Sequence, residues 1–185
     1  PCTINVSQSP SFSPEQLQAA REKLGWSAED RIFIYAGSAA GWQSEDLLDA
    51  FCTKLLEADQ RNKVLFMARF DLEKMACTNQ FSDRVKQVWV SPNEVQDILN
   101  CGDYGLMIRE KTITNKVASP TKFAEYVFAG LKVIASEELG DYSSLIVEKQ
   151  LGTIYKSEKE EFIFENRTFK EKERLSALAL NTFTK

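Results

Sequence analysis

The sequence contains no histidine, and this absence excludes several kinds of catalytic site. A Ser-His-Asp triad, a Cys-His pair and a metal ion held by imidazole all need a residue that the chain lacks. Cysteine is also scarce: Cys2, Cys52, Cys77 and Cys101 lie far apart, and none forms a CxxC pair. We therefore expect buried thiols in a reducing compartment rather than disulfides or a zinc site.

Long apolar runs and an excess of basic charge are missing too. No apolar run comes near the roughly 18 residues that a membrane-spanning helix needs, and the chain does not open with a signal-peptide pattern. Lys and Arg number 23 against 27 Asp and Glu, which argues against a broadly basic surface for nucleic acid. We expect a cytoplasmic location and no nucleic-acid partner.

What the sequence does have is the composition of a folded domain. Its 185 residues are 43% apolar and 27% charged, enough for one domain with a substantial core. Residues 1–13 are rich in Ser and Pro and open with Pro1 rather than Met, so we expect a linker or interdomain arm in a fragment of something longer. Residues 14–185 are expected to form a single domain. Its charged C-terminal segment, 156–185, is expected to be solvated and without chemistry before a final helix.

Apolar, β-prone runs alternate with helical patterns along the chain. Runs of the first kind predict strands at 31–36, 63–68, 85–90, 104–108, 132–135 and 152–155. Capping residues predict helix starts at Ser13, Ser44, Ser91, Ser119 and Asp141, with a further short helix at 71–79. Continuously apolar strands separated by helices indicate an α/β fold: a doubly wound, Rossmann-like parallel sheet of about six strands, in the order 3-2-1-4-5-6, with helices on both faces.

A ligand of such a sheet binds beyond the carboxyl ends of the strands, where the strand order reverses between the first and fourth strands. Loops 37–43 and 109–119 occupy that place. The two glycines of the first loop let backbone approach a phosphate closely, but GSAAG is neither a GxGxxG nor a P-loop motif, and its spacing alone favours an ordinary strand-to-helix turn. Arg69 and Arg109 follow the second and fourth strands. They either add positive charge to this edge or form modest surface salt bridges.

The helix that begins near Ser119 carries a stronger signal. Ser119, Thr121 and Lys122 place hydroxyls, an ammonium and free backbone N–H groups at its start, where the helix dipole favours an anion. At about 100° per residue, Ser119, Lys122, Glu125 and Tyr126 share a polar face. Glu125 then lies one turn deeper, placed to accept hydrogen bonds from a neutral polyol. A surface Lys122–Glu125 ion pair explains the pattern equally well.

This segment, 119–134 (SPTKFAEYVFAGLKVI), together with 103–109 (DYGLMIR) and Gly140-Asp141, resembles the donor-binding half of retaining glycosyltransferases of family 4, which have the GT-B fold. Residues 35–43 (YAGSAAGWQ) are similar to the loop after the first strand of that half. The resemblance covers nearly the whole chain. It implies a nucleotide-sugar donor as substrate, no metal or other cofactor, and an acceptor glycan or lipid-linked glycan bound through a missing N-terminal domain. Any contact with the inner face of a membrane would also come through that domain.

The resemblance also implies a role for individual residues. Glu125 matches the glutamate that binds ribose, and Val90 and Ser91 match the turn that lies against the base. The donor diphosphate and sugar would lie against Gly37, Ser38, Ser119, Thr121 and Lys122. The Arg and Lys that the family usually carries after the first strand are missing here, and Arg109, Lys116 or Lys122 would supply the charge instead. No residue in the chain matches a catalytic acid, base or nucleophile.

The leading interpretation is therefore the donor-binding domain of a retaining glycosyltransferase, which on its own binds nucleotide and turns over little or nothing. The family signature has two glutamates separated by seven residues, and Val117 stands where the first, sugar-facing one belongs. This departure favours the alternative, a non-catalytic nucleotide- or partner-binding module on the same scaffold. A nicotinamide- or flavin-dependent oxidoreductase shares the sheet, but the chain lacks GxGxxG and a suitably placed acidic residue after the second strand. Base, sugar, acceptor and oligomeric state stay open.

Overall fold

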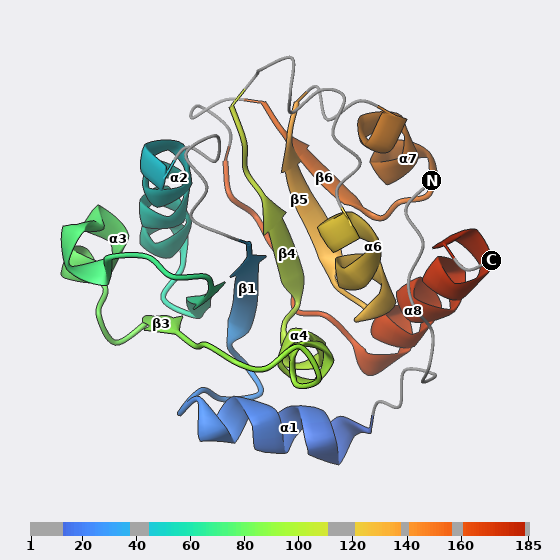
Figure 1. The fold of residues 1–185 in the computed structure, drawn as a ribbon, viewed down its shortest axis with the longest axis horizontal. Coiled ribbons are helices and arrows are strands. Elements are labelled where there is room, and N and C mark those ends of the chain that lie inside the picture. The colour runs from blue at the N-terminus through green and yellow to red at the C-terminus, as the bar shows by residue number, and fades with distance from the viewer. Residues whose placement is uncertain (1–12, 38–44, 111–120, 138–140, 157–160, 184–185) are drawn as a thin grey trace.

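The computed structural model describes residues 13–37, 45–110, 121–137, 141–156 and 161–183. Within these ranges, six parallel strands form one sheet in the order β3-β2-β1-β4-β5-β6, as the sequence predicts (Figure 1). The strands are β1 (Arg31–Ala36), β2 (Asn62–Met67), β3 (Val85–Gln87), β4 (Tyr104–Met107), β5 (Lys132–Ser136) and β6 (Gly152–Tyr155). The order reverses between β1 and β4, so the carboxyl ends of these two strands mark the expected ligand edge.

Helices cover both faces of the sheet (Figure 1). They are α1 (Pro14–Lys23), α2 (Glu45–Ala58), α3 (Ala76–Gln80), α4 (Val95–Cys101), α6 (Thr121–Phe128), α7 (Asp141–Glu148) and α8 (Phe169–Phe183), with a 3₁₀ turn, η1 (Leu72–Lys74). Alternate residues of β1 point to opposite faces of the sheet. Ile32 and Ile34 pack into the core beneath α4, α6 and α8, whereas Phe33 and Tyr35 pack into the core beneath α2 and α3. Every residue of β1 is buried, which explains the apolar sequence that follows Arg31.

The predicted helix caps hold in one case and fail in others. Ser13 and Gln16 form the reciprocal capping box of α1, with nitrogen-to-oxygen distances of 3.1 and 3.2 Å. Before α4, the Glu94 carboxylate accepts hydrogen bonds from the N–H and hydroxyl of Ser91, but the helix begins only at Val95, so Ser91 is not its N-cap. Ser44 and Ser119 lie outside the described residues, and Asp141 is the first residue of α7 rather than its cap.

The region between β2 and α4 differs from its sequence pattern. The helix expected at 71–79 divides into η1 and α3, because Met75 is extended, with φ −83° and ψ 129°. The Asp49 carboxylate of α2 accepts from the N–H groups of Ala76 and Cys77, at 2.7 and 2.9 Å, and so caps α3. The third strand, expected at 85–90, ends at Gln87. The Val88 N–H still donates to the Phe66 carbonyl of β2 at 2.9 Å, and the strand does not continue into the described residues that follow it.

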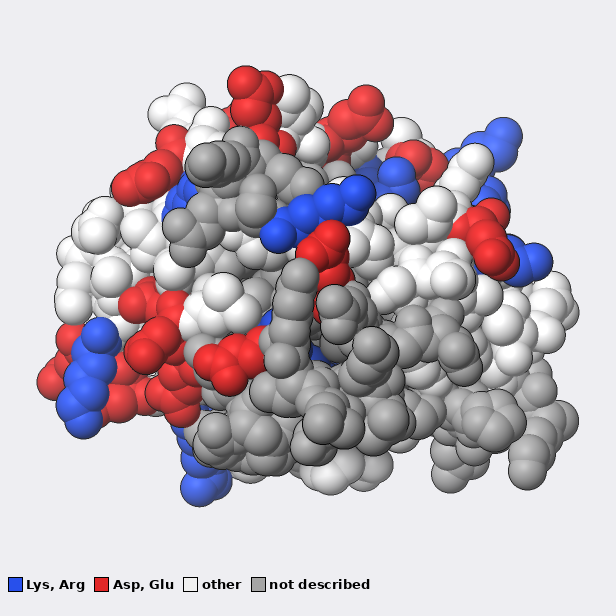
Figure 2. Space-filling model, turned by 90° about the horizontal axis from the view of Figure 1, so that it is seen from above, with Lys and Arg blue, Asp and Glu red and all other residues white. Residues whose placement is uncertain are grey.

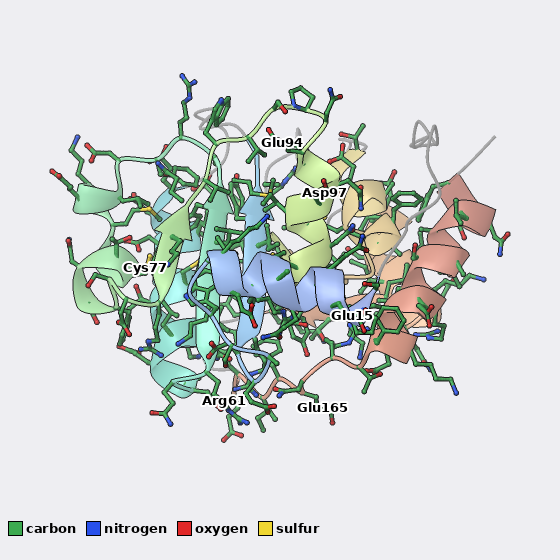
Figure 3. All side chains as sticks on the ribbon, turned by 90° about the horizontal axis from the view of Figure 1, so that it is seen from below. Glu15, Arg61, Cys77, Glu94, Asp97 and Glu165 are labelled. Carbon is green, nitrogen blue, oxygen red and sulfur yellow. The ribbon has the colours of Figure 1, made fainter. Side chains whose placement is uncertain are left out.

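A cluster of buried charged side chains ties α1, α8 and the sheet together at the amino ends of the strands, the edge that Figure 3 views from below with α1 in front. Arg21 donates two hydrogen bonds of 2.8 Å to the Asp103 carboxylate, which also accepts from the Ile32 N–H at 2.9 Å. Lys172 donates to the carbonyls of Asn100, at 3.1 Å, and Gly102. Burial lowers the pKa of Lys172 to about 8. This edge is therefore held by interactions that depend on charge.

The charged segment before α8 is not simply solvated, contrary to the sequence expectation. Phe164 packs against Phe33 and Tyr104 with ring centroids 5.0 and 5.1 Å apart, and Phe162 packs against Phe51 at 5.0 Å. The Tyr104 hydroxyl donates to the Glu165 carbonyl at 2.8 Å. Residues 161–165 thus cover part of the sheet face on which α2 lies, because the half-buried Phe162 and Phe164 alternate with the exposed Glu161, Ile163 and Glu165.

Candidate functional site

A pocket of about 680 Å³ opens at the carboxyl ends of β1, β2 and β3. Four of its lining residues were predicted site residues: Gly37 directly after β1, Val90 and Ser91 after β3, and Lys122 in the first turn of α6. The other described lining residues are Met67, Val88, Trp89, Pro92 and Val95. The pocket is therefore apolar on the side of β2, β3 and α4, with an ammonium group and a glycine at its other side.

Tyr126 fixes α6 against the end of β1, a role that the sequence did not reveal. Its side chain is fully buried, so the predicted position on a polar face of the helix is wrong. The hydroxyl accepts a hydrogen bond of 2.7 Å from the N–H of Ala36, the last residue of β1. Gly105 of β4 makes room for the ring, since a Cβ there would lie 2.5 Å from two Tyr126 ring atoms. This packing sets the position of Lys122 relative to Gly37.

Lys122 and Glu125 form an ion pair, which explains their sequence pattern as well as a ligand site does. The distance between Lys122 Nζ and Glu125 Oε2 is 2.6 Å, and each side chain is about one-third exposed, 33% and 32%. The pair places a positive and a negative group at the start of α6, and Lys122 itself reaches the pocket. Both side chains remain accessible to a ligand that offers a better partner.

Arg109 lies just beyond β4, half-buried, and its backbone N–H donates to the Ser136 hydroxyl at 2.8 Å. Burial lowers the pKa of its guanidinium below the usual range, and the nearby Tyr35 and Tyr126 hydroxyls partly offset this. A guanidinium titrates far above neutral pH, so the group keeps its charge. Arg109 thus places a cation near the hydroxyls of Tyr35 and Tyr126, but it is not part of the described pocket lining.

The predicted site residues fall into three groups. Gly37, Val90, Ser91 and Lys122 come together around one pocket, while Arg109, Thr121 and Glu125 lie near it without lining it. Ser38 and Ser119 are outside the described residues. Figure 2 looks onto this edge of the molecule and shows acidic side chains gathered on the side of α2 and α3.

Trp89 is a pocket residue that the sequence reasoning missed. It is 66% exposed, and the Arg69 guanidinium lies 4.2 Å from its ring centroid. Arg69 therefore contacts an aromatic ring. Its position in the sequence predicted either positive charge at this edge or a surface salt bridge, and the ring contact is neither. The available signal was the place of Trp89 in the chain, directly before the two residues that the resemblance assigns to a base.

Two other site types receive no support within the described ranges. No group of three or more cysteine, aspartate or glutamate side chains could hold a metal ion there. In the same part of the chain, no helix has the length and apolar character to cross a bilayer.

The six-stranded parallel sheet in this order matches the fold of one half of a GT-B glycosyltransferase. Among solved structures, WaaG, a glycosyltransferase involved in lipopolysaccharide biosynthesis, matches with a TM-score of 0.61 and 16% identity over 98% of this chain and 46% of WaaG. Anabaena HepE, solved in complex with UDP, matches with a TM-score of 0.63 and 14% identity over 94% of this chain and 50% of HepE.

A further similar structure is itself a single domain. The C-terminal domain of LpcC, a group 1 family glycosyltransferase from Francisella tularensis, matches with a TM-score of 0.59 and 10% identity over 90% of this chain and 82% of that domain. No protein-family model and no curated protein sequence matches the chain. The chain spans about half the length of WaaG and HepE. At identities this low, the matches show a shared fold alone.

Proposed function

We propose that the chain is the donor-binding half of a retaining glycosyltransferase that moves a sugar from a nucleotide diphosphate to an acceptor. One observation carries the proposal: Gly37, Val90, Ser91 and Lys122, drawn from three separate segments, surround one pocket at the ligand edge of the sheet. The structures that share the fold include HepE, solved with UDP. The acceptor, a glycan or lipid-linked glycan, would be bound by a second domain.

In this proposal, each end of the pocket takes a different part of the donor. The apolar side formed by Val88, Val90 and Val95 suits a flat base, and Lys122 suits the diphosphate. Arg109, Thr121, Ser38 and Ser119 would add charge and hydrogen bonds near the phosphates and sugar. Fixed positive groups of this kind stabilise the diphosphate as its negative charge grows on departure from the sugar.

Glu125 would bind the ribose hydroxyls. Its carboxylate is about one-third exposed and is held by Lys122 at 2.6 Å, close to the pocket that Lys122 lines. A carboxylate accepts two hydrogen bonds from a vicinal diol, and a diphosphate offers Lys122 a new partner. Binding of the donor would then replace the ion pair with two contacts to the ligand.

Glu125→Ala tests this proposal. We expect the affinity for the nucleoside diphosphate that the wild-type chain binds to fall at least about tenfold, roughly 1.4 kcal/mol, with the fold retained. Calorimetric titration with UDP, GDP, ADP and NAD measures this, and Glu148→Ala, an exposed glutamate of α7, is the matched control. Unchanged affinity in Glu125→Ala would remove the ribose assignment.

The same titration separates the other interpretations. Binding of NAD alone would indicate an oxidoreductase on the same sheet. Binding of none of the four would indicate a partner-binding module, the alternative that Val117 favours.

A further inference from the structure

Trp89 is exposed in a way that its neighbours do not explain. Large aromatic side chains are usually buried, yet Trp89 is 66% exposed while lining the pocket with Val88 and Val90. Its ring is nevertheless held in place, because the Arg69 guanidinium lies 4.2 Å from the ring centroid. An exposed indole with one face fixed by a cation is preorganised to receive a second flat group.

The two faces of the ring have different surroundings. Arg69 is exposed and, within the described residues, does not line the pocket that Trp89 lines. The guanidinium therefore supports the ring from outside the pocket. The indole lines the pocket together with apolar side chains: Met67 of β2, Val88, Val90 and Pro92 from the segment after β3, and Val95 of α4.

We propose that Trp89, supported by Arg69, is the stacking platform for the nucleobase of the donor. This inference rests on the proposed function and adds to it a residue that decides affinity for the base. A nucleobase is flat and apolar on its faces, so it gains from stacking on an indole and from the apolar side chains beside it. The diphosphate would then extend toward Lys122 and Gly37, on the other side of the pocket.

The test compares ligands with and without a base. Calorimetric titrations use UDP, GDP, ADP and inorganic pyrophosphate with the wild-type chain, Trp89→Ala, Trp89→Phe and Arg69→Met. Val147→Ala, which changes a residue of equal exposure on α7, is the control. Urea unfolding of each variant verifies that the fold is retained.

Trp89→Ala is expected to weaken binding of the best nucleotide about tenfold, a typical effect of losing one base-aromatic stack, and to leave pyrophosphate binding unchanged. Trp89→Phe keeps an aromatic face and should stay within about threefold of the wild type. Arg69→Met should give an intermediate loss, because the indole is no longer held. Nucleotide binding should also quench tryptophan fluorescence, and Trp89→Phe should remove that quenching.

Two results would overturn the inference while leaving the proposed function intact. One is wild-type affinity for the nucleotide in Trp89→Ala. The other is an equal loss of nucleotide and pyrophosphate binding, which would locate the effect at the phosphates. If the wild-type chain bound pyrophosphate but none of the three nucleotides, or bound nothing, the proposed function itself would fail and the platform with it.

Discussion

Asp103→Asn is expected to destabilise the fold strongly, because the carboxylate is the counter-charge for two buried cations. Arg21 donates to both of its oxygens at 2.8 Å, and the two side chains are only 9% and 2% exposed. Lys172 is buried in the same cluster and interacts electrostatically with Asp103. An asparagine keeps one acceptor oxygen for Arg21 but removes the negative charge, so both cations are left without compensation.

The magnitude follows from the burial of the pair. Removing one partner of a buried ion pair costs about 3–5 kcal/mol. For a chain of this size, each kcal/mol corresponds to about 2–4 °C in Tm, so the expected fall in Tm is roughly 6–20 °C. Urea unfolding at pH 7, followed by tryptophan fluorescence and circular dichroism, gives the free energy of unfolding directly.

A surface ion pair provides the matched control. Asp71 Oδ2 and Lys74 Nζ are 2.8 Å apart, with side chains 54% and 82% exposed, so Asp71→Asn should cost less than about 1 kcal/mol. If the two Asp→Asn variants lost similar free energy, the argument that burial makes the Asp103 charge indispensable would be refuted. In the double variant Arg21→Met/Asp103→Asn, the free energy of unfolding lost through Asp103→Asn should be smaller than in the wild-type background. The reason is that Arg21, one of the two cations, is already absent.

Two further predictions concern buried groups at opposite edges of the sheet. Burial lowers the pKa of Lys172 to about 8 from the ordinary 10.5. Between these two pH values the unfolded chain therefore binds more protons than the native chain. The free energy of unfolding of the wild type should rise with pH over this range when it is compared with that of Lys172→Met. Burial also raises the pKa of Cys101 to about 11, and the nearby Lys172 charge partly opposes that rise. Lys172→Met therefore raises the Cys101 pKa further, so the variant loses more stability than the wild type at high pH and the difference rises with the same sign. A difference that falls between pH 8 and 10.5 would contradict the assignment. Tyr126→Phe leaves the Ala36 N–H without its 2.7 Å acceptor and should lower the free energy of unfolding by about 1–3 kcal/mol. Hydrogen exchange at the Ala36 amide, measured by NMR, should also become faster. An unchanged exchange rate would show that the bond does not protect this amide.

The order of the sheet could be predicted because it depends on features that are local in sequence. Apolar runs such as 31–36 coincide with strands, and the Ser13–Gln16 capping box marks the start of α1. Right-handed crossovers then leave few ways to arrange six parallel strands. The predicted meeting of the residues after β1 and β3 with the start of α6 follows from this order, and Gly37, Val90 and Lys122 do line one pocket.

The errors arose where a residue's partner is distant in sequence. Helical spacing predicts Tyr126 on the same polar face as Lys122 and Glu125, but its side chain is buried and its hydroxyl is bonded to Ala36, 90 residues away. The charge count of the segment before α8 concealed Phe162 and Phe164, whose ring partners lie on α2, β1 and β4. In both cases the local pattern gave the polarity of the segment, whereas long-range packing decided which side chains are buried.

The Lys122–Glu125 pair does not argue against the proposed donor site. Exposed pairs at this helical spacing stabilise by only about 0.2–0.5 kcal/mol, and both side chains remain about one-third exposed. A diphosphate carries more charge than one carboxylate, so it competes well for Lys122, and a ribose diol can then bind the released Glu125. In the absence of donor, the pair keeps both groups beside the pocket and neutralises them at little cost. The surface ion pair and the ligand-binding role therefore describe the same two residues in the absence and in the presence of a ligand.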